Sequence, residues 1–368
     1  FMLEGFYQTL KKVEKMELVD YGNDDFWVKD KQNKKYAAEF VLSLFREKGE
    51  DKKSAIEAFE TMSCISKNQE YSPKVEKKRT SMPGEDGWWY FKLYGTELET
   101  IICEKILPFC NKSLRENLID CFYFIRYTDP ALHIRLRIKI SDEAKGKSEK
   151  LINWLKSLKE SHIIREFTIN FYERELERYG GEVPFRYAEK FFFYDSMYIS
   201  ELLRVKRTEA INEKLAVMSN LFILNTFTRD LNQQLRLFEV NMGELKRYKK
   251  AFKSELKDYI AIYGQLNEMV PIYKLQIESE LQCNNIVDLM KLRNNQFEKY
   301  VLVLNEQDKK GLLSNSFDDI IFSIMHMHCN RFSGNREFEY KVLEYTYRTI
   351  FAYRNYKKHV LDSNSEEK

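Results

Sequence analysis

The sequence predicts an α+β fold in which a small, mainly antiparallel sheet accompanies a large helical portion. Two patterns predict this class. Between about residues 88 and 174, short segments alternate apolar and polar residues, as half-buried strands do. From Ala188 to about residue 358, apolar residues recur at spacings of three and four with few breakers, as in amphipathic helices. The 368 residues, 43% of them hydrophobic, suffice for a packed core.

The first 80 residues are expected to form a helical segment that precedes the main domain. Residues 37–45 and 54–62 predict two helices joined by a charged turn. This pair is either a plain helical hairpin or a helix-turn-helix element, and the whole segment is alternatively the end of a preceding domain. Residues 66–87 are polar and end in Pro-Gly and Asp-Gly pairs, which predicts a linker. The main domain is then expected over residues 85–360.

Within the main domain, each expected element follows from its local pattern. Alternation predicts strands at 88–94, 121–127, 131–140 and 167–174. Helical spacing predicts helices near 97–118 and 150–160, and then over about 197–268, 273–304 and 337–358, with Pro271 interrupting one stretch.

The strand over residues 131–140 has two chemically different faces. Successive strand side chains point to opposite sides of a sheet, so an apolar face holds Leu132, Ile134, Leu136 and Ile138, and a basic face holds His133, Arg135, Arg137 and Lys139. Guanidinium groups match carboxylates in a bidentate geometry, which indicates an anionic or carboxylate-bearing ligand. The alternative is a solvated charged face on a half-exposed strand.

Composition excludes several classes of protein. A net charge of only +3 is far from the basic excess of a dedicated nucleic-acid binder. The six cysteines form no C-x-x-C pair, which argues against a thiolate zinc site and a disulfide framework and favours reduced cytoplasmic thiols. No run of about 18 apolar residues and no glycine-rich nucleotide loop occurs.

Two further segments carry candidate functional residues. In the segment 172–181, Glu175 and Arg178 stand three residues apart and predict either a surface ion pair or an arginine held by the glutamate and turned toward the basic strand. Gly180 and Gly181 would end this helical turn.

The segment 319–331 carries two histidines that point to different sides of one helix. His328 shares a stripe with Ile321 and Ile324, which is the setting of a core histidine. His326 shares its side with polar residues, which we expect to orient its imidazole: Asp319, Ser323 and Asn330. His326 is therefore the better candidate for proton transfer, although a structural histidine is commoner for such a motif alone.

Taken together and in this order, the motifs resemble the C-terminal, glutamate-eliminating domain of class I lanthipeptide dehydratases, the nisin-dehydratase type, a family that also includes stand-alone thiopeptide biosynthesis proteins. The resemblance covers about residues 85–355 and rests on Trp88–Tyr94, Phe124–Arg137, Glu175–Gly181, Ala188–Ser196 and His326–Gly334.

The resemblance implies a function. Family members make dehydroalanine and dehydrobutyrine in ribosomal precursor peptides: a glutamylation domain esterifies Ser or Thr, and the domain resembled here removes the glutamate. The catalytic residues implied are His326, Arg137 and Arg178, with Arg174 and His328 as alternates. Substrate-binding roles are implied for Arg126, Arg135 and Arg331, and no metal or organic cofactor is implied.

The resemblance also implies partners and a location. The expected partners are the precursor peptide and a glutamylation domain or a separate glutamylating protein. A cyclase and a second copy of the chain in a homodimer are further expected partners. Direct contact with nucleic acid is not expected. The expected location is cytoplasmic. The chain is too short for a full glutamylation domain, so it is either a stand-alone protein or a fragment of a longer dehydratase.

Two alternatives differ from glutamate elimination. One is the pyridine-forming cycloaddition of some thiopeptide proteins, which lack the arginine pattern kept here. The other is a non-catalytic peptide-binding module, in which a helix-turn-helix over residues 33–64 would help to hold a leader peptide.

Overall fold

The computed structural model describes residues 79–205, 208–242, 245–266 and 280–366, together with two short strands near the amino end. The chain divides into two compact units, Phe1–Lys74 and Val75–Lys368. In the first unit, β1 (Val28–Lys29) pairs antiparallel with β2 (Lys35–Tyr36), a pairing that the sequence analysis did not expect. The helices expected over 37–45 and 54–62 lie outside the described residues.

The second unit contains the small antiparallel sheet, and the predicted α+β class is confirmed. Its four strands follow the order β5-β6-β4-β7, and each neighbouring pair is antiparallel. The strands are β4 (Trp88–Tyr94), β5 (Ile119–Tyr127), β6 (His133–Ile140) and β7 (Glu166–Asn170). Each of the four predicted strands has its counterpart here, within a few residues at the ends.

A second, two-stranded sheet corrects the predicted linker. β3 (Thr80–Ser81) pairs antiparallel with β8 (Tyr172–Glu173), so the end of the segment 66–87 is part of the folded unit. A short 3-10 turn, η1 (Glu85–Gly87), then leads directly into β4. The turn-forming residues predicted a linker between domains here. They instead form a tight connection between β3 and β4.

The alternation in β6 gives this strand one apolar side. Ile134, Leu136 and Ile138 are fully buried. Leu132 is the exception, because β6 begins at His133 and Leu132 lies in the preceding turn with 45% of its surface exposed. The prediction that Leu132 belongs to the apolar face was therefore wrong.

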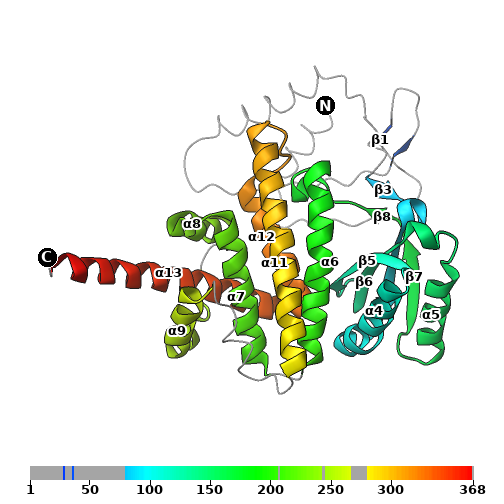
Figure 1. Cartoon of the computed structure of the whole chain (residues 1–368), viewed down its shortest axis with the longest axis horizontal. Coiled ribbons are helices and arrows are strands. Elements are labelled where there is room, and N and C mark those ends of the chain that lie inside the picture. Colours follow the sequence, from blue (N-terminus) through cyan, green and yellow to red (C-terminus); the bar gives the residue numbers. More distant parts are fainter. Residues whose placement is uncertain are drawn as a thin grey trace, which may run out of the picture. The chain divides into compact units, whose positions relative to one another are not determined.

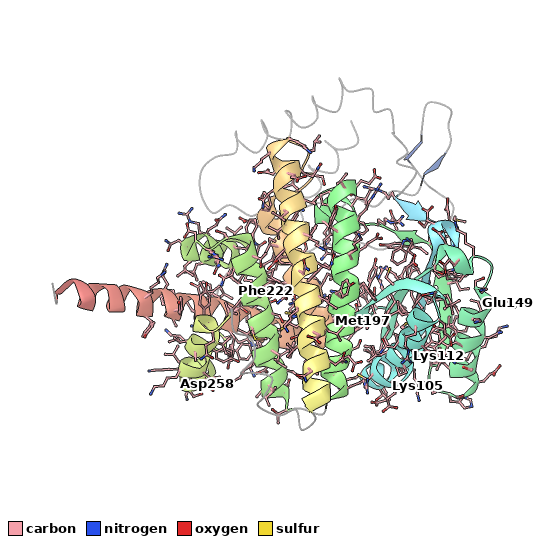
Figure 2. All side chains as sticks on the ribbon, viewed as in Figure 1. Lys105, Lys112, Glu149, Met197, Phe222 and Asp258 are labelled. Carbon is pink, nitrogen blue, oxygen red and sulfur yellow. The ribbon has the colours of Figure 1, made fainter. Side chains whose placement is uncertain are left out.

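Helices from the first half of the second unit pack against the sheet (Figure 1). They are α3 (Leu98–Thr100), which continues through a π-helical stretch (Ile101–Ile106) into α4 (Leu107–Arg115), and α5 (Glu149–Glu160). Phe109 of α4 stacks on Trp154 of α5 with ring centroids 4.0 Å apart. On the outer surface of these helices, Lys112 and Glu149 face away from the core (Figure 2).

The large helical portion follows the sheet in the chain. It consists of α6 (Glu182–Arg204), α7 (Glu209–Phe227), α8 (Leu231–Met242), α9 (Lys249–Gly264), α11 (Glu280–Lys309), α12 (Phe317–Phe332) and α13 (Arg336–Glu366). The stretch predicted as helical from 197 to 268 is thus divided among four helices. One break has a clear cause, because the Asp230 carboxylate accepts a hydrogen bond from the Asn232 backbone N–H and caps a new helix.

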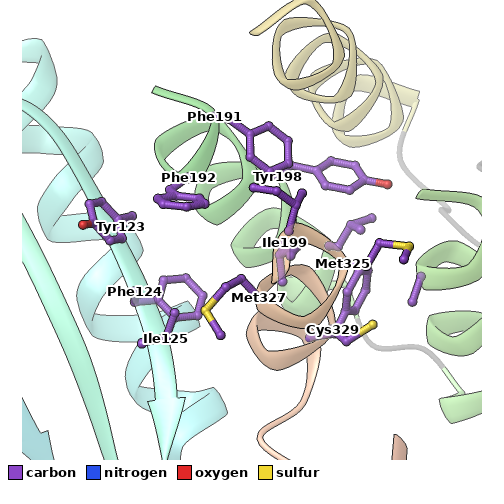
Figure 3. Packing of buried hydrophobic residues seen from close by; sticks show 14 of the residues in the cluster. Tyr123, Phe124, Ile125, Phe191, Phe192, Tyr198, Ile199, Met325, Met327 and Cys329 are labelled. Carbon is purple, nitrogen blue, oxygen red and sulfur yellow. The ribbon is translucent and has the colours of Figure 1, made fainter. Parts of the chain in front are cut away.

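The core joins the sheet to two of these helices. Figure 3 shows Phe124 and Ile125 of β5 beside Met327 of α12, with Phe192 and Ile199 of α6 close by. This packing fixes α12 against the sheet, and α12 carries both candidate histidines.

None of the helices in the described part of the chain has the length and the apolar character that a membrane-spanning helix requires.

Gly180 supports the connection between the sheet and α6, and its substitution tests the fold. It ends the 3-10 turn η4 (Glu177–Tyr179) with a φ of 95°, and an added Cβ would lie 2.6 Å from Leu304 Cδ2. We expect Gly180→Ala to lower the free energy of unfolding by about 1–3 kcal/mol, because both the backbone and the contact become strained.

The matched control is Gly146→Ala. Gly146 also has a positive φ, of 90°, but an added Cβ would meet nothing within 4 Å. Denaturant unfolding should therefore show a smaller loss for Gly146→Ala, and equal losses would contradict the role assigned to the Leu304 contact.

Candidate functional site

The register of the sheet surrounds Arg137 with aromatic rings. On the side opposite the apolar face, Arg137 of β6 pairs with Tyr90 of β4 and with Tyr123 of β5. Directly opposed side chains in a sheet lie about 4.5–5.5 Å apart at Cβ, so both rings necessarily flank the arginine. The guanidinium carbon lies 4.5 Å from the Tyr90 ring centroid, 5.2 Å from that of Tyr123 and 5.5 Å from that of Tyr172.

The Arg137 guanidinium is charged and has unpaired donors. Burial lowers its pKa, but nearby tyrosines and Glu175 more than offset this effect, so the pKa is raised above its ordinary value. Its Nε and Nη1 atoms are buried and have no hydrogen-bond acceptor among the described residues. Buried charged donors are normally satisfied, so this group is suited to bind an anion.

A second arginine reaches the same place from the turn before α6. Arg178 donates from Nη1 to Glu175 at 2.8 Å and from Nε to Ser323 of α12 at 3.2 Å. The predicted ion pair is confirmed, and the bond to α12 shows that it is more than a surface pair. Arg137, Arg178 and Arg331 line one small cavity of about 40 Å³.

His326 is held by a carboxylate from the next helix. Its Nδ1 lies 2.5 Å from Oε1 of Glu339 on α13. A carboxylate accepts the proton of Nδ1–H, which leaves Nε2 as the basic nitrogen. We had expected Asp319, Ser323 and Asn330 to orient this ring, but the bound partner is Glu339.

The surroundings of His326 form a larger cavity of about 730 Å³. His326 keeps 36% of its side-chain surface exposed. Tyr127 lines both this cavity and the small arginine cavity. Ser323 and His326 are three residues apart on α12, so their Cβ atoms lie about 5–6 Å apart. Arg178, which binds Ser323, therefore reaches the same part of α12 as His326.

Asn330 attaches the end of α12 to β5. Its side-chain oxygen accepts from the Arg126 backbone N–H at 2.8 Å, and its Nδ2 donates to the Arg126 carbonyl at 2.9 Å. Arg126 is itself buried, and its Nε donates to the Arg331 carbonyl at 3.2 Å. Arg126 lines the cavity of His326, but the described hydrogen bond of its guanidinium is to a backbone carbonyl.

His328 and Arg331 belong to a fully buried charge network. Asp195 of α6 accepts from Arg293 at 2.7 Å, from His328 at 2.7 Å and from Arg331 at 3.0 Å. Burial alone would raise the pKa of Asp195, but these three partners hold it well below the ordinary value. Burial lowers the pKa of His328, so we assign it as neutral, with Nδ1–H donating to Asp195.

Two further predicted arginines, Arg135 and Arg174, differ in their position relative to the site. Arg135 lies over the Tyr127 ring at 3.4 Å from its centroid. Arg174, an alternate for Arg178, instead binds Glu189 and Ser81 and lines a separate cavity of about 680 Å³. Arg137 and Arg178 are thus the arginines that share a cavity, and Arg331 joins them from the buried network.

Sequence reasoning missed three groups of functional interest: the tyrosines around Arg137, the carboxylate of Glu339 and the carboxylate of Asp195. The alternation of β4 and β5 could have predicted that Tyr90 and Tyr123 share one face of the sheet. The pairing of Glu339 with His326 depends on the packing of α13 against α12, which no local sequence pattern predicts.

Comparison with known proteins identifies the family. The sequence model described as lantibiotic biosynthesis dehydratase C-term matches residues 88–350. The chain belongs to this family.

The matched relatives of this lantibiotic dehydratase C-terminal chain are much longer than it is. Subtilin biosynthesis protein SpaB of Bacillus subtilis is 30% identical over 375 residues, covering 96% of this chain and 33% of the relative. Nisin biosynthesis protein NisB of Lactococcus lactis subsp. lactis is 28% identical over 286 residues, covering 77% and 27% respectively. The chain therefore spans about a third of the length of these relatives.

A solved structure shares the fold. The tRNA dependent lantibiotic dehydratase MibB from Microbispora sp. 107891 superposes with a TM-score of 0.63 at 18% sequence identity. The match covers 76% of this chain and 29% of that chain. At this level of identity the likeness concerns the fold alone.

The buried network makes a prediction for stability. We expect Asp195→Asn to lower the free energy of unfolding by about 3–5 kcal/mol, because two buried arginines lose their counter-charge. The folded pKa of Asp195 is lowered, so its stabilisation is fully present above the unfolded pKa of about 3.9 and is lost progressively as the pH falls from there through the lowered folded pKa. Denaturant unfolding between about pH 2 and pH 7 measures both effects.

Asp258→Asn is the control, because Asp258 is 62% exposed and binds Lys214 at 2.8 Å. An exposed ion pair contributes about 0–1 kcal/mol. Equal losses in the two variants would contradict the importance of the buried network.

Proposed function

We propose that this domain eliminates glutamate from glutamylated Ser or Thr residues of a ribosomal precursor peptide, producing dehydroalanine or dehydrobutyrine. The observation that carries the proposal is the charged Arg137, whose buried Nε and Nη1 have no acceptor among the described residues. It lines a small cavity with a second arginine, and that cavity meets the cavity of His326 at Tyr127. Such a site suits a reaction that releases a carboxylate beside a base.

The reaction requires removal of a weakly acidic proton. His326 Nε2 takes the Cα proton of the esterified residue, and the electron pair of the C–H bond becomes the Cα–Cβ double bond. The Cβ–O bond breaks, and glutamate leaves as a carboxylate. His326 becomes an imidazolium, and the Glu339 carboxylate at Nδ1 stabilises this charge.

The departing carboxylate determines the role of the arginines. Arg137 faces the negative charge that develops on the leaving oxygen, and Arg178 holds the other end of the glutamyl group. A preorganised donor of this kind contributes about 3–4 kcal/mol to lowering the barrier. Arg126, Arg135 and Arg331 are proposed to support substrate binding around this centre, Arg126 and Arg331 chiefly by fixing α12.

His326 suits the role of base better than His328. The His328 ring is fully buried and its Nδ1 is bound by Asp195, so a substrate proton cannot reach it. The His326 side chain lines an open cavity. We propose the precursor peptide and a glutamylating domain or protein as partners. The pyridine-forming alternative is not favoured, because the matched sequence relatives named above are subtilin and nisin biosynthesis proteins.

Replacement of Arg137 tests the central claim. With a chemically glutamylated peptide as substrate, we expect Arg137→Gln to reduce kcat for elimination by about 10²–10³-fold, because the leaving carboxylate loses its donor. Mass spectrometry should show that the glutamyl unit persists on the peptide. Arg186→Gln is the control, because Arg186 is 57% exposed and pairs with Glu182. Elimination at the wild-type rate by Arg137→Gln would refute the assigned role.

His326→Ala should also make the glutamylated peptide accumulate. General-base catalysis contributes roughly 10²–10⁴-fold, so kcat should fall by that factor. A non-catalytic binding module would show no elimination by the wild-type domain either. Unchanged dehydration by His326→Ala would assign the proton transfer to another group.

Glu339 is proposed to position His326, and its two variants separate orientation from charge. Gln at position 339 can still accept from Nδ1–H but carries no charge, whereas Ala removes both contributions. We expect kcat to fall in the order wild type, Glu339→Gln, Glu339→Ala, with KM nearly unchanged and with an altered pH profile of kcat. Glu337→Gln is the control on the same helix, where Glu337 pairs with the exposed Arg247. A matching loss in Glu337→Gln would indicate a general effect on α13.

A further inference from the structure

We propose that the two cavities of the site and a third one form a continuous groove at one end of the sheet, which binds an extended segment of the substrate peptide. The glutamylated residue lies at Tyr127, and the neighbouring residues run past Leu132 toward Ile163. This inference rests on the proposed function and adds to it where the peptide chain lies and which side chains it presents.

The groove is built from chain segments that meet at the same end of the sheet. These are the segment after β4, the turn between β5 and β6, and the segment before β7. Backbone hydrogen bonds hold them together: Gly95 N–H donates to the Leu132 carbonyl at 3.2 Å, and Arg165 N–H donates to the Tyr94 carbonyl at 2.8 Å. The end of α12 reaches the same place through the bonds between Asn330 and Arg126.

Shared lining residues show that the cavities adjoin one another. Tyr127 lines both the arginine cavity and the cavity of His326. Thr96 and Leu132 line both the cavity of His326 and a third cavity of about 420 Å³. The proposed path of the peptide therefore runs from Tyr127 past His326 to the third cavity.

The third cavity has mainly apolar walls. Ala131, Leu132, Ile163 and Ile164 line it, with His162 and Arg165 alongside. Among them, Leu132 is 45% exposed. Exposed apolar side chains along a cavity indicate contact with another apolar group, so an apolar side chain of the ligand fits here.

The occupant follows from continuity with the proposed active site. A modified Ser or Thr in a peptide has chain neighbours, and these must leave the reaction centre along the protein surface. A carboxylate of the glutamyl group points into the small arginine cavity, which at about 40 Å³ has no room for the peptide chain. Thr96 and Leu132 belong to the walls of both the His326 cavity and the third cavity. An extended strand of peptide fits along this shared wall.

The test compares peptides of different length. One probe is a synthetic peptide of about ten residues, which spans roughly 35 Å when extended, with one O-glutamyl serine near its middle and apolar residues on both sides. The other is a short peptide that carries the same O-glutamyl serine with a single residue on each side. We expect the wild-type domain to show a KM for the long peptide about 10-fold lower than for the short one, because the long peptide buries apolar surface in the groove.

Leu132→Asp should remove this advantage, so that the ratio of the two KM values falls toward one. Ala131→Trp, which fills the third cavity, should do the same by a different physical route. Ile169→Asp is the matched control, because Ile169 of β7 is 43% exposed but lines none of the three cavities. Replacing the flanking apolar residues of the long peptide by aspartate, one position at a time, should raise KM for the wild type at the positions that enter the third cavity.

The outcomes separate the two proposals. If the wild-type domain eliminates glutamate from neither peptide, the proposed function fails. If it eliminates from both peptides but Leu132→Asp and Ala131→Trp keep the wild-type KM ratio, the groove is not the peptide site. A changed oligomeric state of Leu132→Asp in light scattering, with an unchanged KM ratio, would overturn the inference and assign the surface to contacts between copies of the chain.

Discussion

One buried carboxylate fixes the helices that carry the site. Asp195 of α6 binds Arg293 of α11 and two residues of α12, His328 and Arg331. Movement of any of these helices would leave a buried charge without its partner, which is costly in a low-dielectric interior. His326 is two positions from His328 and so faces the other side of α12. The position of the proposed base therefore depends on contacts made on the opposite side of its own helix.

The sheet provides a second constraint, which is electrostatic. Arg137 remains charged although Nε and Nη1 lack acceptors among the described residues, and the rings of Tyr90, Tyr123 and Tyr172 partly compensate for the lost water. Aromatic faces stabilise a cation without neutralising it. The guanidinium thus keeps its attraction for an anion, which a bound carboxylate of the protein would have cancelled.

Local patterns predicted the parts of the fold and site that depend on one element at a time. The alternation over residues 131–140 predicted that Arg135 and Arg137 share a face, and helical periodicity predicted that His328 is buried while His326 is accessible. Both outcomes depend on the geometry of a single strand or helix.

Partners that lie far apart in the sequence could not be predicted in this way. Asp195 is 133 residues from His328, and Glu339 reaches His326 only because α13 packs against α12. The predicted linker also failed for this reason, since β3 is a strand through pairing with β8, about 90 residues later. One boundary within 197–268 depends on the short capping interaction of Asp230, which apolar periodicity does not register.

The placement of Tyr127 has a consequence for how two products separate. Its ring belongs to the walls of both the arginine cavity and the His326 cavity. In the proposed reaction this ring would stand between the released acid and the polymer, so that the small acid would depart while the polymer stays bound. A polypeptide with several hydroxyl side chains would then advance by a few residues and present the next one, which is the geometry that repeated modification during one encounter requires.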